Sequence, residues 1–139
     1  MLNIKIRKLV PEAVIPAYTK VGDAGMDVYA ISKNETDKFV EYGTGLAFEV
    51  PEGYVLLVFA RSSVSNTNLI LANSVGVLDS GYRGELKLRF RKMGTEDYQL
   101  GERVGQIMVL PYPQVNFEEV VELSDTERGV GGFGSSGKN

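Results

Sequence analysis

The sequence predicts an all-β fold, a barrel or sandwich made of many short strands. Apolar and polar residues alternate over short stretches, as at the start of the chain, where Leu2, Ile4 and Ile6 alternate with polar neighbours. No stretch keeps the 3.6-residue period of a long amphipathic helix. Turn-forming residues end each apolar stretch after a few positions, as at Pro51 and Gly53. Short strands separated by frequent turns are typical of β-barrels and β-sandwiches.

The strands are expected in the following order along the chain. The first contains Leu2, Ile4 and Ile6. Alternation or a short apolar run predicts further strands at residues 23–30, 39–42, 45–50, 54–60, 69–72, 75–78, 85–91, 98–100 and 106–110. Residues 117–123 alternate only loosely. A polar turn is predicted at residues 33–38, and a brief helical turn capped by a serine is predicted to begin in residues 61–66.

Residues 73–84, Asn-Ser-Val-Gly-Val-Leu-Asp-Ser-Gly-Tyr-Arg-Gly, are the centre of the functional prediction. An Asp-Ser-Gly turn lies between the predicted strands 75–78 and 85–91, which indicates a β-hairpin. Asp79 and Tyr82 then lie together at the tip of this hairpin. Such a turn often has only a structural role, so Asp79 alone does not define a site.

The composition limits the chemistry that the chain can perform. Its 139 residues are enough for one domain with a hydrophobic core. It contains no cysteine and no histidine, which excludes disulfides, thiolate nucleophiles, Ser-His-Asp triads and histidine-ligated metals. Any acid–base step must therefore use Asp, Glu, Lys, Tyr or water.

Charge and hydropathy also restrict the partners. The net charge of −3 argues against a broad nucleic-acid surface, but it is compatible with a small phosphate ligand bound by a few arginines. No stretch approaches the roughly 20 apolar residues of a membrane span. The N-terminal residues lack the apolar core of a signal peptide. We therefore expect a cytoplasmic protein with neither a nucleic-acid nor a membrane partner.

Three polar groups are candidates for binding an anion or a metal. Arg61 to Ser63 follow a predicted buried strand and combine a guanidinium with two hydroxyls. Asp23 and Asp27 flank Ala-Gly-Met in another strand, and Arg103 and Gln106 follow a glycine near a third. Taken singly, each group is more often a helix cap, a turn residue or a solvated side chain.

The last twelve residues, Arg-Gly-Val-Gly-Gly-Phe-Gly-Ser-Ser-Gly-Lys-Asn, differ from the rest. They match G-x-G-x-x-G and most of a Walker A pattern, but both motifs require a strand before and a helix after them. Glycine N–H groups, Ser135, Ser136 and Arg128 nevertheless suit phosphate, and Phe133 suits stacking on a base. We expect a β-barrel domain at 1–127 and a mobile arm at 128–139, with a disordered tail of no function as the alternative.

The candidate motifs follow one another from residue 23 to residue 137. They are D-A-G-M-D, R-S-S, N-S-V-G-V-L-D-S-G-Y-R-G, G-E-R-V-G-Q-I and R-G-V-G-G-F-G-S-S-G. Together they closely resemble the homotrimeric dUTPases (deoxyuridine triphosphate nucleotidohydrolases), over nearly the whole chain. The resemblance implies a jelly-roll-like β-barrel, a homotrimer with shared active sites, and Mg²⁺-assisted hydrolysis of dUTP to dUMP and pyrophosphate. Such an enzyme keeps uracil out of DNA and supplies dUMP for dTMP synthesis.

The resemblance also implies a role for each candidate residue. Asp79 would orient or deprotonate the attacking water, and Arg128 would reach the terminal phosphate. Tyr82 would exclude a 2′-hydroxyl, and Asp27 would touch the water shell of an Mg²⁺ held mainly by the triphosphate. The other substrate-binding residues would be Asn73, Val77, Leu78, Lys87 and Phe133 at uracil, Arg61, Ser62, Ser63 and Gln106 at the phosphates, and Gly134, Ser135 and Ser136 in the closing arm.

Two alternatives remain at this stage. A related dCTP deaminase on the same scaffold needs a carboxylate beside the base, and the segment between Ala72 and Leu78 contains Asn73 and Ser74 but no acid. A nucleotide-responsive regulatory module without catalysis is the second. The complete set of candidate catalytic residues favours the enzyme, but it does not exclude an added regulatory role.

Overall fold

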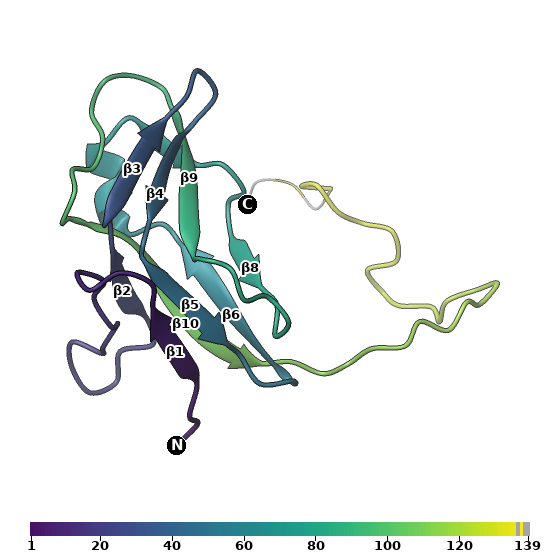
Figure 1. Cartoon of the computed structure of the whole chain (residues 1–139). Helices are drawn as coiled ribbons and strands as arrows, with labels where there is room; N and C mark the ends of the chain where they lie inside the picture. The colour runs from purple at the N-terminus through teal and green to yellow at the C-terminus, as the bar shows by residue number, and fades with distance from the viewer. Residues whose placement is uncertain (136, 138–139) are drawn as a thin grey trace.

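A computed structural model describes residues 1–135 and 137 (Figure 1). In this part of the chain, antiparallel strands form two four-stranded sheets and one two-stranded sheet. The first sheet has the order β2-β10-β6-β8, with the strands Met26–Tyr29, Arg103–Pro111, Tyr54–Phe59 and Gly76–Leu78. The second has the order β3-β4-β9-β7, with Ser32–Glu35, Val40–Gly43, Lys87–Lys92 and Leu69–Leu71. The small sheet pairs β1 (Lys5–Lys8) with β5 (Leu46–Glu49).

Most paired strands are distant in sequence, such as β10 with β2 and β9 with β4. These long crossovers between antiparallel strands are those of a jelly roll. The predicted all-β, jelly-roll-like barrel is therefore confirmed.

Alternation along the strands separates the core from the surface. In β9, Leu88 and Phe90 point inward with 1% and 0% exposure, whereas Lys87, Arg89 and Arg91 point outward. Burying each leucine or phenylalanine side chain contributes roughly 1.5–3 kcal/mol. The inward side chains of all three sheets form one cluster, whose largest fully buried members are Tyr42, Phe90, Leu46, Leu56, Leu88 and Ile107.

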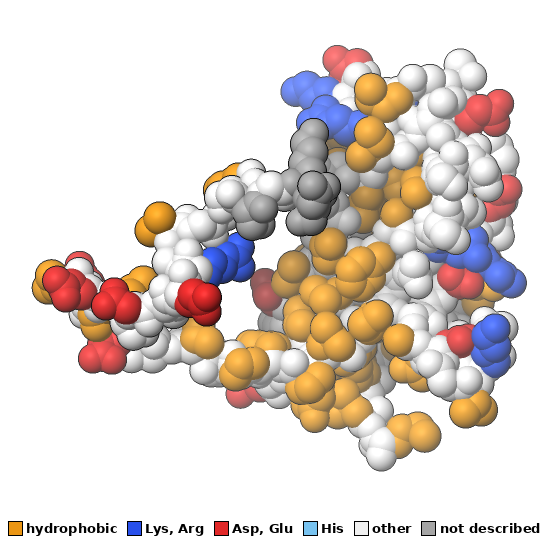
Figure 2. Space-filling view, turned by 180° about the vertical axis from the view of Figure 1, so that it is seen from behind, with side chains coloured by type: hydrophobic (Ala, Val, Ile, Leu, Met, Phe, Trp, Pro, Cys, Tyr) orange, Lys and Arg blue, Asp and Glu red, His pale blue; other side chains and the backbone are white. Residues whose placement is uncertain are grey.

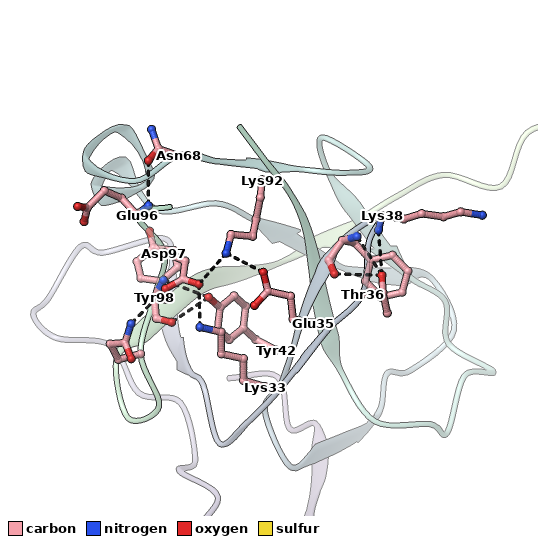
Figure 3. A network of polar contacts seen from close by, with 12 residues as sticks. Lys33, Glu35, Thr36, Lys38, Tyr42, Asn68, Lys92, Glu96, Asp97 and Tyr98 are labelled. Atoms are coloured by element: carbon pink, nitrogen blue, oxygen red, sulfur yellow. Dashed lines mark hydrogen bonds and ion pairs between the residues drawn. The ribbon is translucent and has the colours of Figure 1, made fainter. Parts of the chain in front are cut away.

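Tyr42 organises the polar part of this core (Figure 3). Its hydroxyl donates to the carbonyl of Tyr98 at 2.9 Å and accepts the amide N–H of the same residue at 3.0 Å. Its ring packs edge-on against Phe90 and Tyr98. Burial, with the nearby Asp97 carboxylate, raises the pKa of Tyr42 far above its usual value, so this phenol stays neutral.

Several local expectations are wrong. Residues 33–38 were expected to be a turn, but Ser32–Glu35 form the edge strand β3, and the turn begins at Thr36, whose Oγ1 accepts the N–H groups of Lys38 and Phe39. Polar residues suffice for β3 because an edge strand is solvated. Residues 98–100 form no strand, because the hydroxyl of Tyr42 bonds to both the N–H and the carbonyl of Tyr98, which a strand would use for pairing. The first strand begins at Lys5 rather than at Leu2.

The turn of the central segment is confirmed, but the predicted hairpin is not. The N–H of Tyr82 donates to the carbonyl of Asp79 at 3.1 Å, closing the expected turn. The flanking strands do not pair with each other: β8 pairs with β6, and β9 pairs with β4 and β7. The two sides of the turn therefore belong to different sheets, and they diverge instead of closing a ladder.

A 3-10 helix, Ser62–Asn66, follows β6 and confirms the expected helical turn. The residue at its N-terminal cap is Arg61, with extended backbone, and no side chain caps the helix. The serine cap was therefore predicted wrongly. The guanidinium of Arg61 bonds instead to the side chains of Asp27 and Ser63.

The chain changes character after β10, which ends at Pro111. Residues 112–130 are exposed and form no strand, including the loosely alternating 117–123, and Figure 1 shows this segment leaving the body of the molecule. Within the described residues, no helix has the length and apolar character needed to cross a membrane.

Candidate active site

A cavity of about 470 Å³ lies where β8 and β9 diverge, and we call it the β8–β9 pocket. Five of the six residues predicted to contact the base and the sugar line it: Asn73, Val77, Leu78, Tyr82 and Lys87. The sixth, Phe133, does not. The error in the hairpin prediction thus has a consequence, because the strands that fail to pair leave space for a ligand between them.

The floor of the β8–β9 pocket depends on close backbone packing. A Cβ atom on Gly76 would lie 3.0 Å from Cβ of Val58 and 3.5 Å from the amide nitrogen of Asn73. The preceding Ser74 has a left-handed φ of 62°, and the N–H of Val75 bonds to the carbonyl of Asn73 at 2.6 Å. This tight turn fixes the backbone of Asn73 at the wall, where its side chain lines the pocket.

Tyr82 is held against its own loop. Its hydroxyl donates to the carbonyl of Glu85 at 2.9 Å. A Cβ atom on Gly84 would lie 2.6 Å from Cζ of Tyr82, so only glycine fits under the ring. The residue as a whole is nevertheless 46% exposed, so Tyr82 remains accessible to a ligand.

The base of this loop is anchored to the turn between β4 and β5. Thr44, almost fully buried, donates its hydroxyl to the carbonyl of Leu86 at 2.7 Å. The carboxylate of Glu85 accepts the N–H of Gly45 at 3.0 Å. These bonds tie the pocket wall to the core, so the pocket is preformed.

Glu41 and Arg89 also line the β8–β9 pocket, although the sequence did not identify them. The carboxylate of Glu41 accepts Nε of Arg89 at 2.7 Å and lies 3.5 Å from Nζ of Lys87. Burial alone would raise the pKa of Glu41, but the hydrogen bond from Arg89 and the charges of Lys87 and Arg89 outweigh it and lower the pKa. No sequence pattern links residues 48 positions apart; the signal lies in the pairing of β4 with β9, which sets Glu41 opposite Arg89.

Asp79 lies directly after Leu78, which lines the β8–β9 pocket, although Asp79 is not itself among the lining residues. It is exposed, and within the described residues no hydrogen bond or ion pair engages its carboxylate. Its backbone is fixed by the turn to Tyr82. A carboxylate on a fixed backbone, open to solvent near a cavity, is placed to bind a water molecule.

A second polar group forms where β2, β6 and β10 meet, and we call it the anion cluster: Asp27, Arg61, Ser63, Arg103 and Gln106. Nε of Arg61 bonds to Asp27 at 2.8 Å, and Nη1 of Arg61 donates to Oγ of Ser63 at 3.2 Å. Arg103 lies 3.6 Å from the other carboxylate oxygen of Asp27. The side-chain amide of Gln106 donates to the carbonyl of Ala60 at 3.1 Å. The structure thus brings four of the predicted phosphate and metal residues together, with Ser62 exposed beside them on the 3-10 helix.

Asp27 suits the outer shell of a hydrated Mg²⁺ better than direct ligation. No group of three or more acidic, cysteine or histidine side chains that could hold a metal occurs in the described residues. Mg²⁺ often binds through one or two carboxylates, several waters and substrate phosphates. A single partly exposed carboxylate, held by two arginines, fits that mode.

The predicted arm residues do not join either group. Nε of Arg128 donates to the carbonyl of Gly131 at 2.9 Å, and Phe133 is exposed with a left-handed φ of 53°. The hydrogen bonds of the described residues 128–135 stay between neighbours in the chain. Gly134 and Ser135 lie in the same exposed stretch, and Ser136 lies outside the described residues.

The β8–β9 pocket and the anion cluster lie on opposite sides of one sheet. β8 and β2 are its two edge strands, so three interstrand steps, roughly 14 Å, separate them. The pocket is lined by the inward-facing Val58 and Leu78. Asp27 and Gln106 alternate with the buried Val28 and Ile107, so they face outward. The β8–β9 pocket and the anion cluster therefore lie on opposite faces of this sheet, although β6 contributes to the pocket through Val58 and leads directly into Arg61.

The jelly-roll barrel has a pocket large enough for a base and, near it, an exposed carboxylate that could bind water. A separate cluster can bind phosphates. These features are those of a protein that binds and hydrolyses a nucleotide. Comparison with known proteins agrees. The dUTPase family model matches residues 11–137. The chain therefore belongs to the dUTPase family.

Relatives and solved structures support this assignment. The chain is 40% identical to the deoxyuridine 5'-triphosphate nucleotidohydrolase of Clostridioides difficile, covering 99% of both chains. It is 41% identical to the protein of the same name from Nautilia profundicola, covering 99% of this chain and 100% of that protein. A mutant dUTPase of Staphylococcus bacteriophage 80alpha, solved with dUpNHpp, superposes with a TM-score of 0.84 at 26% identity, covering 99% of this chain and 100% of the other.

A more distant structure supports the fold alone. A mutant dUTPase from phage phi11 of S. aureus, described as showing the coordination of a structural Mg(II) ion, superposes with a TM-score of 0.76 at 22% identity. It covers 89% of this chain and 100% of the phage chain.

Proposed function

We propose that this protein is a dUTP diphosphatase, which hydrolyses dUTP to dUMP and pyrophosphate. One observation carries the proposal: the residues of the barrel domain that are expected at uracil and at deoxyribose all line a single preformed cavity, and Asp79 directly follows one of them, Leu78. The activity named for the relatives from C. difficile and N. profundicola agrees with it.

The β8–β9 pocket suits uracil for two reasons. The amide of Asn73 offers both a donor and an acceptor, which matches the edge of the base. Backbone groups near Val77, Leu78 and Lys87 supply further polar contacts at the wall. Close contact between this backbone and the ring of the base would leave no room for a thymine methyl group, so the site should select against dTTP.

Tyr82 provides selection at the sugar. Its ring is fixed by the bond to Glu85 and by the absence of a side chain at Gly84. A deoxyribose lying against this ring leaves no space for a 2′-hydroxyl. The same residue therefore explains a preference for dUTP over UTP.

Arg61, Ser62, Ser63 and Gln106 are the proposed phosphate ligands of the anion cluster. Guanidinium and hydroxyl groups bind phosphate oxygens well, and Asp27 would contact the water shell of Mg²⁺. When bound to the triphosphate, Mg²⁺ neutralises its charge and stabilises the leaving group. The residues of this chain orient the phosphates around it.

Asp79 is the proposed base. A bound water gives a proton to its carboxylate, and the water oxygen forms a bond to the α-phosphorus. The bond between the α-phosphorus and the oxygen bridging to the β-phosphate breaks, and pyrophosphate leaves with that oxygen. Without a histidine in the chain, a carboxylate is the natural group for this step.

The separation of the β8–β9 pocket from the anion cluster supports a homotrimer with shared sites. Since the two groups face opposite sides of one sheet, we propose that the nucleotide takes its base contacts from one copy and its phosphate contacts from another. Exposed apolar side chains along the extended segment, including Val115, Phe117 and Leu123, also call for a neighbouring surface. Figure 2 shows hydrophobic side chains both on this segment and on the face of the body beside it. In a closed ring of three copies, each exposed apolar surface would be covered by a neighbouring copy.

The arm at 128–139 is proposed to close the site over the barrel domain at 1–127. Arg128 would bind the terminal phosphate and Phe133 would stack on uracil, while Gly134, Ser135 and Ser136 would donate to phosphate oxygens. The hydrogen bonds of its described residues join only neighbours in the chain, so closure would break few of them. A closed arm excludes all water but the nucleophile.

The reaction has a clear cellular role. Removing dUTP keeps uracil out of DNA, and dUMP feeds the synthesis of dTMP. The substrate is a nucleotide precursor of DNA, which points to the cytoplasm as the place of action.

A nucleotide panel tests the proposal. Pyrophosphate release from dUTP, UTP, dCTP and dTTP is measured with Mg²⁺ and with a chelator. We expect turnover of dUTP alone, and we expect it to fall when Mg²⁺ is removed.

Two outcomes of the panel would replace the proposal. Release of ammonia from dCTP would identify a deaminase; the acids of the β8–β9 pocket, Glu41 and Glu85, are already bonded to protein groups, which argues against it. Tight binding of dUTP without turnover would identify a regulatory module.

A further inference from the structure

Ser63 is linked to the core through a chain of hydrogen bonds that the proposed reaction does not explain. Its Oγ accepts a bond from Nη1 of Arg61 at 3.2 Å and lies 3.0 Å from the hydroxyl of Tyr98. Tyr98 belongs to the loop between β9 and β10, and its residue is 95% buried. A phenol from inside the barrel thus reaches the proposed phosphate ligand.

Tyr98 is held more firmly than an ordinary loop residue (Figure 3). The hydroxyl of Tyr42 binds both its N–H and its carbonyl. The preceding Asp97 forms ion pairs with Lys33 at 2.7 Å and Lys92 at 3.5 Å, and Lys92 also pairs with Glu35. The backbone of Tyr98 is therefore held by β4 directly, and by β3 and β9 through the ion pairs of the neighbouring Asp97.

Counting donors and acceptors shows what this geometry does. A serine hydroxyl has one proton to donate and two lone pairs that accept. Arg61 can only donate, so it fills one lone pair of Ser63. A phenol is a stronger donor than an aliphatic alcohol, so the hydroxyl of Tyr98 fills the other. The proton of Ser63 then has no partner on this side and points away from both residues.

We propose that Tyr98 is a positioning residue, which donates to Ser63 and thereby directs the hydroxyl proton of Ser63 toward a phosphate oxygen of the bound nucleotide. A surface cavity of about 370 Å³, lined by Arg61, Ser63, Tyr98 and Arg103 among others, provides the space beside them. The proposal rests on the function proposed above, in which Ser63 binds phosphate. It adds that the orientation of Ser63 is set from the core.

The test compares a ligand that has phosphates with one that lacks them. Dissociation constants are measured for dUpNHpp, a non-hydrolysable dUTP analogue, and for deoxyuridine. In Tyr98→Phe, the affinity for dUpNHpp is expected to fall roughly threefold to tenfold, the effect of one lost hydrogen bond, while that for deoxyuridine stays unchanged. Tyr29→Phe removes a hydroxyl from the same cavity that has no bond to Ser63, and it should leave both constants unchanged.

A double-mutant cycle with Ser63→Ala separates positioning from general loosening. In the Ser63→Ala background, Tyr98→Phe should cause no further loss of dUpNHpp affinity. Additive losses, or an equal loss for deoxyuridine, would overturn the proposal. If neither ligand binds the unmodified protein, the proposed function itself fails, which is a different result.

A second variant covers the case in which Tyr98→Phe does not fold. Replacing Tyr98 with 3,5-difluorotyrosine retains the ring and the hydroxyl but lowers the pKa of the phenol. Loss of that proton removes the donor, so dUpNHpp affinity should fall as pH rises through the new pKa. The same pH profile for this variant and the unmodified protein would contradict the proposal.

Discussion

The β8–β9 pocket and the anion cluster are built from different kinds of contacts. The pocket is built from backbone, glycines and packed side chains, and its wall is bonded to the core through Thr44 and Glu85. The anion cluster is built from long charged side chains held by one another, chiefly Arg61 by Asp27. Under the proposed function, shape would select the base and the sugar, whereas charge and hydroxyl donors would hold the phosphates.

This difference predicts different sensitivities. A change in the pocket should alter which nucleotide is accepted, because the fit of the base and the sugar changes. A change in the cluster should weaken every triphosphate alike. A change at Asp79, the proposed base, should affect turnover alone.

The largest effect is expected for Asp79→Asn. The substitution keeps the size of the side chain but removes the proton acceptor, so kcat should fall about a thousandfold. Binding of dUpNHpp should be retained, which calorimetry can measure. Asp37→Asn, in the exposed turn after β3, serves as the control. Turnover of Asp79→Asn near the unmodified rate would show that Asp79 is not the base.

Deletion of residues 129–139 should have the next largest effect. Loss of the closing arm leaves the nucleotide open to water and without its stacking partner, so kcat should fall roughly 10- to 100-fold. The melting temperature should change little, since the described part of this segment packs on nothing in its own chain. A large fall in melting temperature instead would make the segment structural.

Gly84→Ala probes shape in the pocket. The added methyl group overlaps the ring of Tyr82, which must leave its bond to Glu85. We expect the ratio of kcat/KM for dUTP over UTP to drop roughly threefold to tenfold, the value of about one lost positioning contact. Gly81→Ala, where a Cβ atom meets nothing within 4 Å, is the matched control. An unchanged ratio in Gly84→Ala would remove Tyr82 from sugar selection.

The smallest effect concerns Glu41 and is seen in stability. Its pKa is lowered in the folded protein below the ordinary value of 4.5, so its contribution is present above that value and is lost as pH falls through the folded pKa. Glu41→Gln should therefore destabilise the protein by less than about 1 kcal/mol at pH 7, and the difference should vanish in acid. Urea titrations at several pH values measure this, with Glu118→Gln as the control. A difference that grows in acid would contradict the sign.

Local patterns in the sequence were sufficient for some features. Alternation identified most strands, and the Asp-Ser-Gly signature identified the turn at Asp79. The predicted residues of the β8–β9 pocket came from the resemblance to the dUTPases, whose motif covers residues 73–84 of this chain. The sequence motifs identified the residues of the anion cluster, but they did not predict which of these residues contact one another.

Features that depend on assembly of the sheets were not predictable in this way. The hairpin was inferred from its turn, yet β8 pairs with β6, and β9 pairs with β4 and β7, so the two strands belong to different sheets. Glu41 meets Arg89, and Ser63 meets Tyr98, only through pairings across long stretches of chain. The partner of the extended segment is not in the chain at all under the trimer proposal.

Mixing two inactive variants tests the shared site most directly. Asp79→Asn damages the β8–β9 pocket side, and Arg61→Ala damages the anion cluster. If each site takes these two groups from different copies, unfolding and refolding an equimolar mixture should restore dUTP hydrolysis to about a quarter of the unmodified rate, because a quarter of randomly assembled sites receive two intact groups. A mixture that stays as inactive as its components would show that one chain supplies both groups, and the proposed arrangement would be wrong.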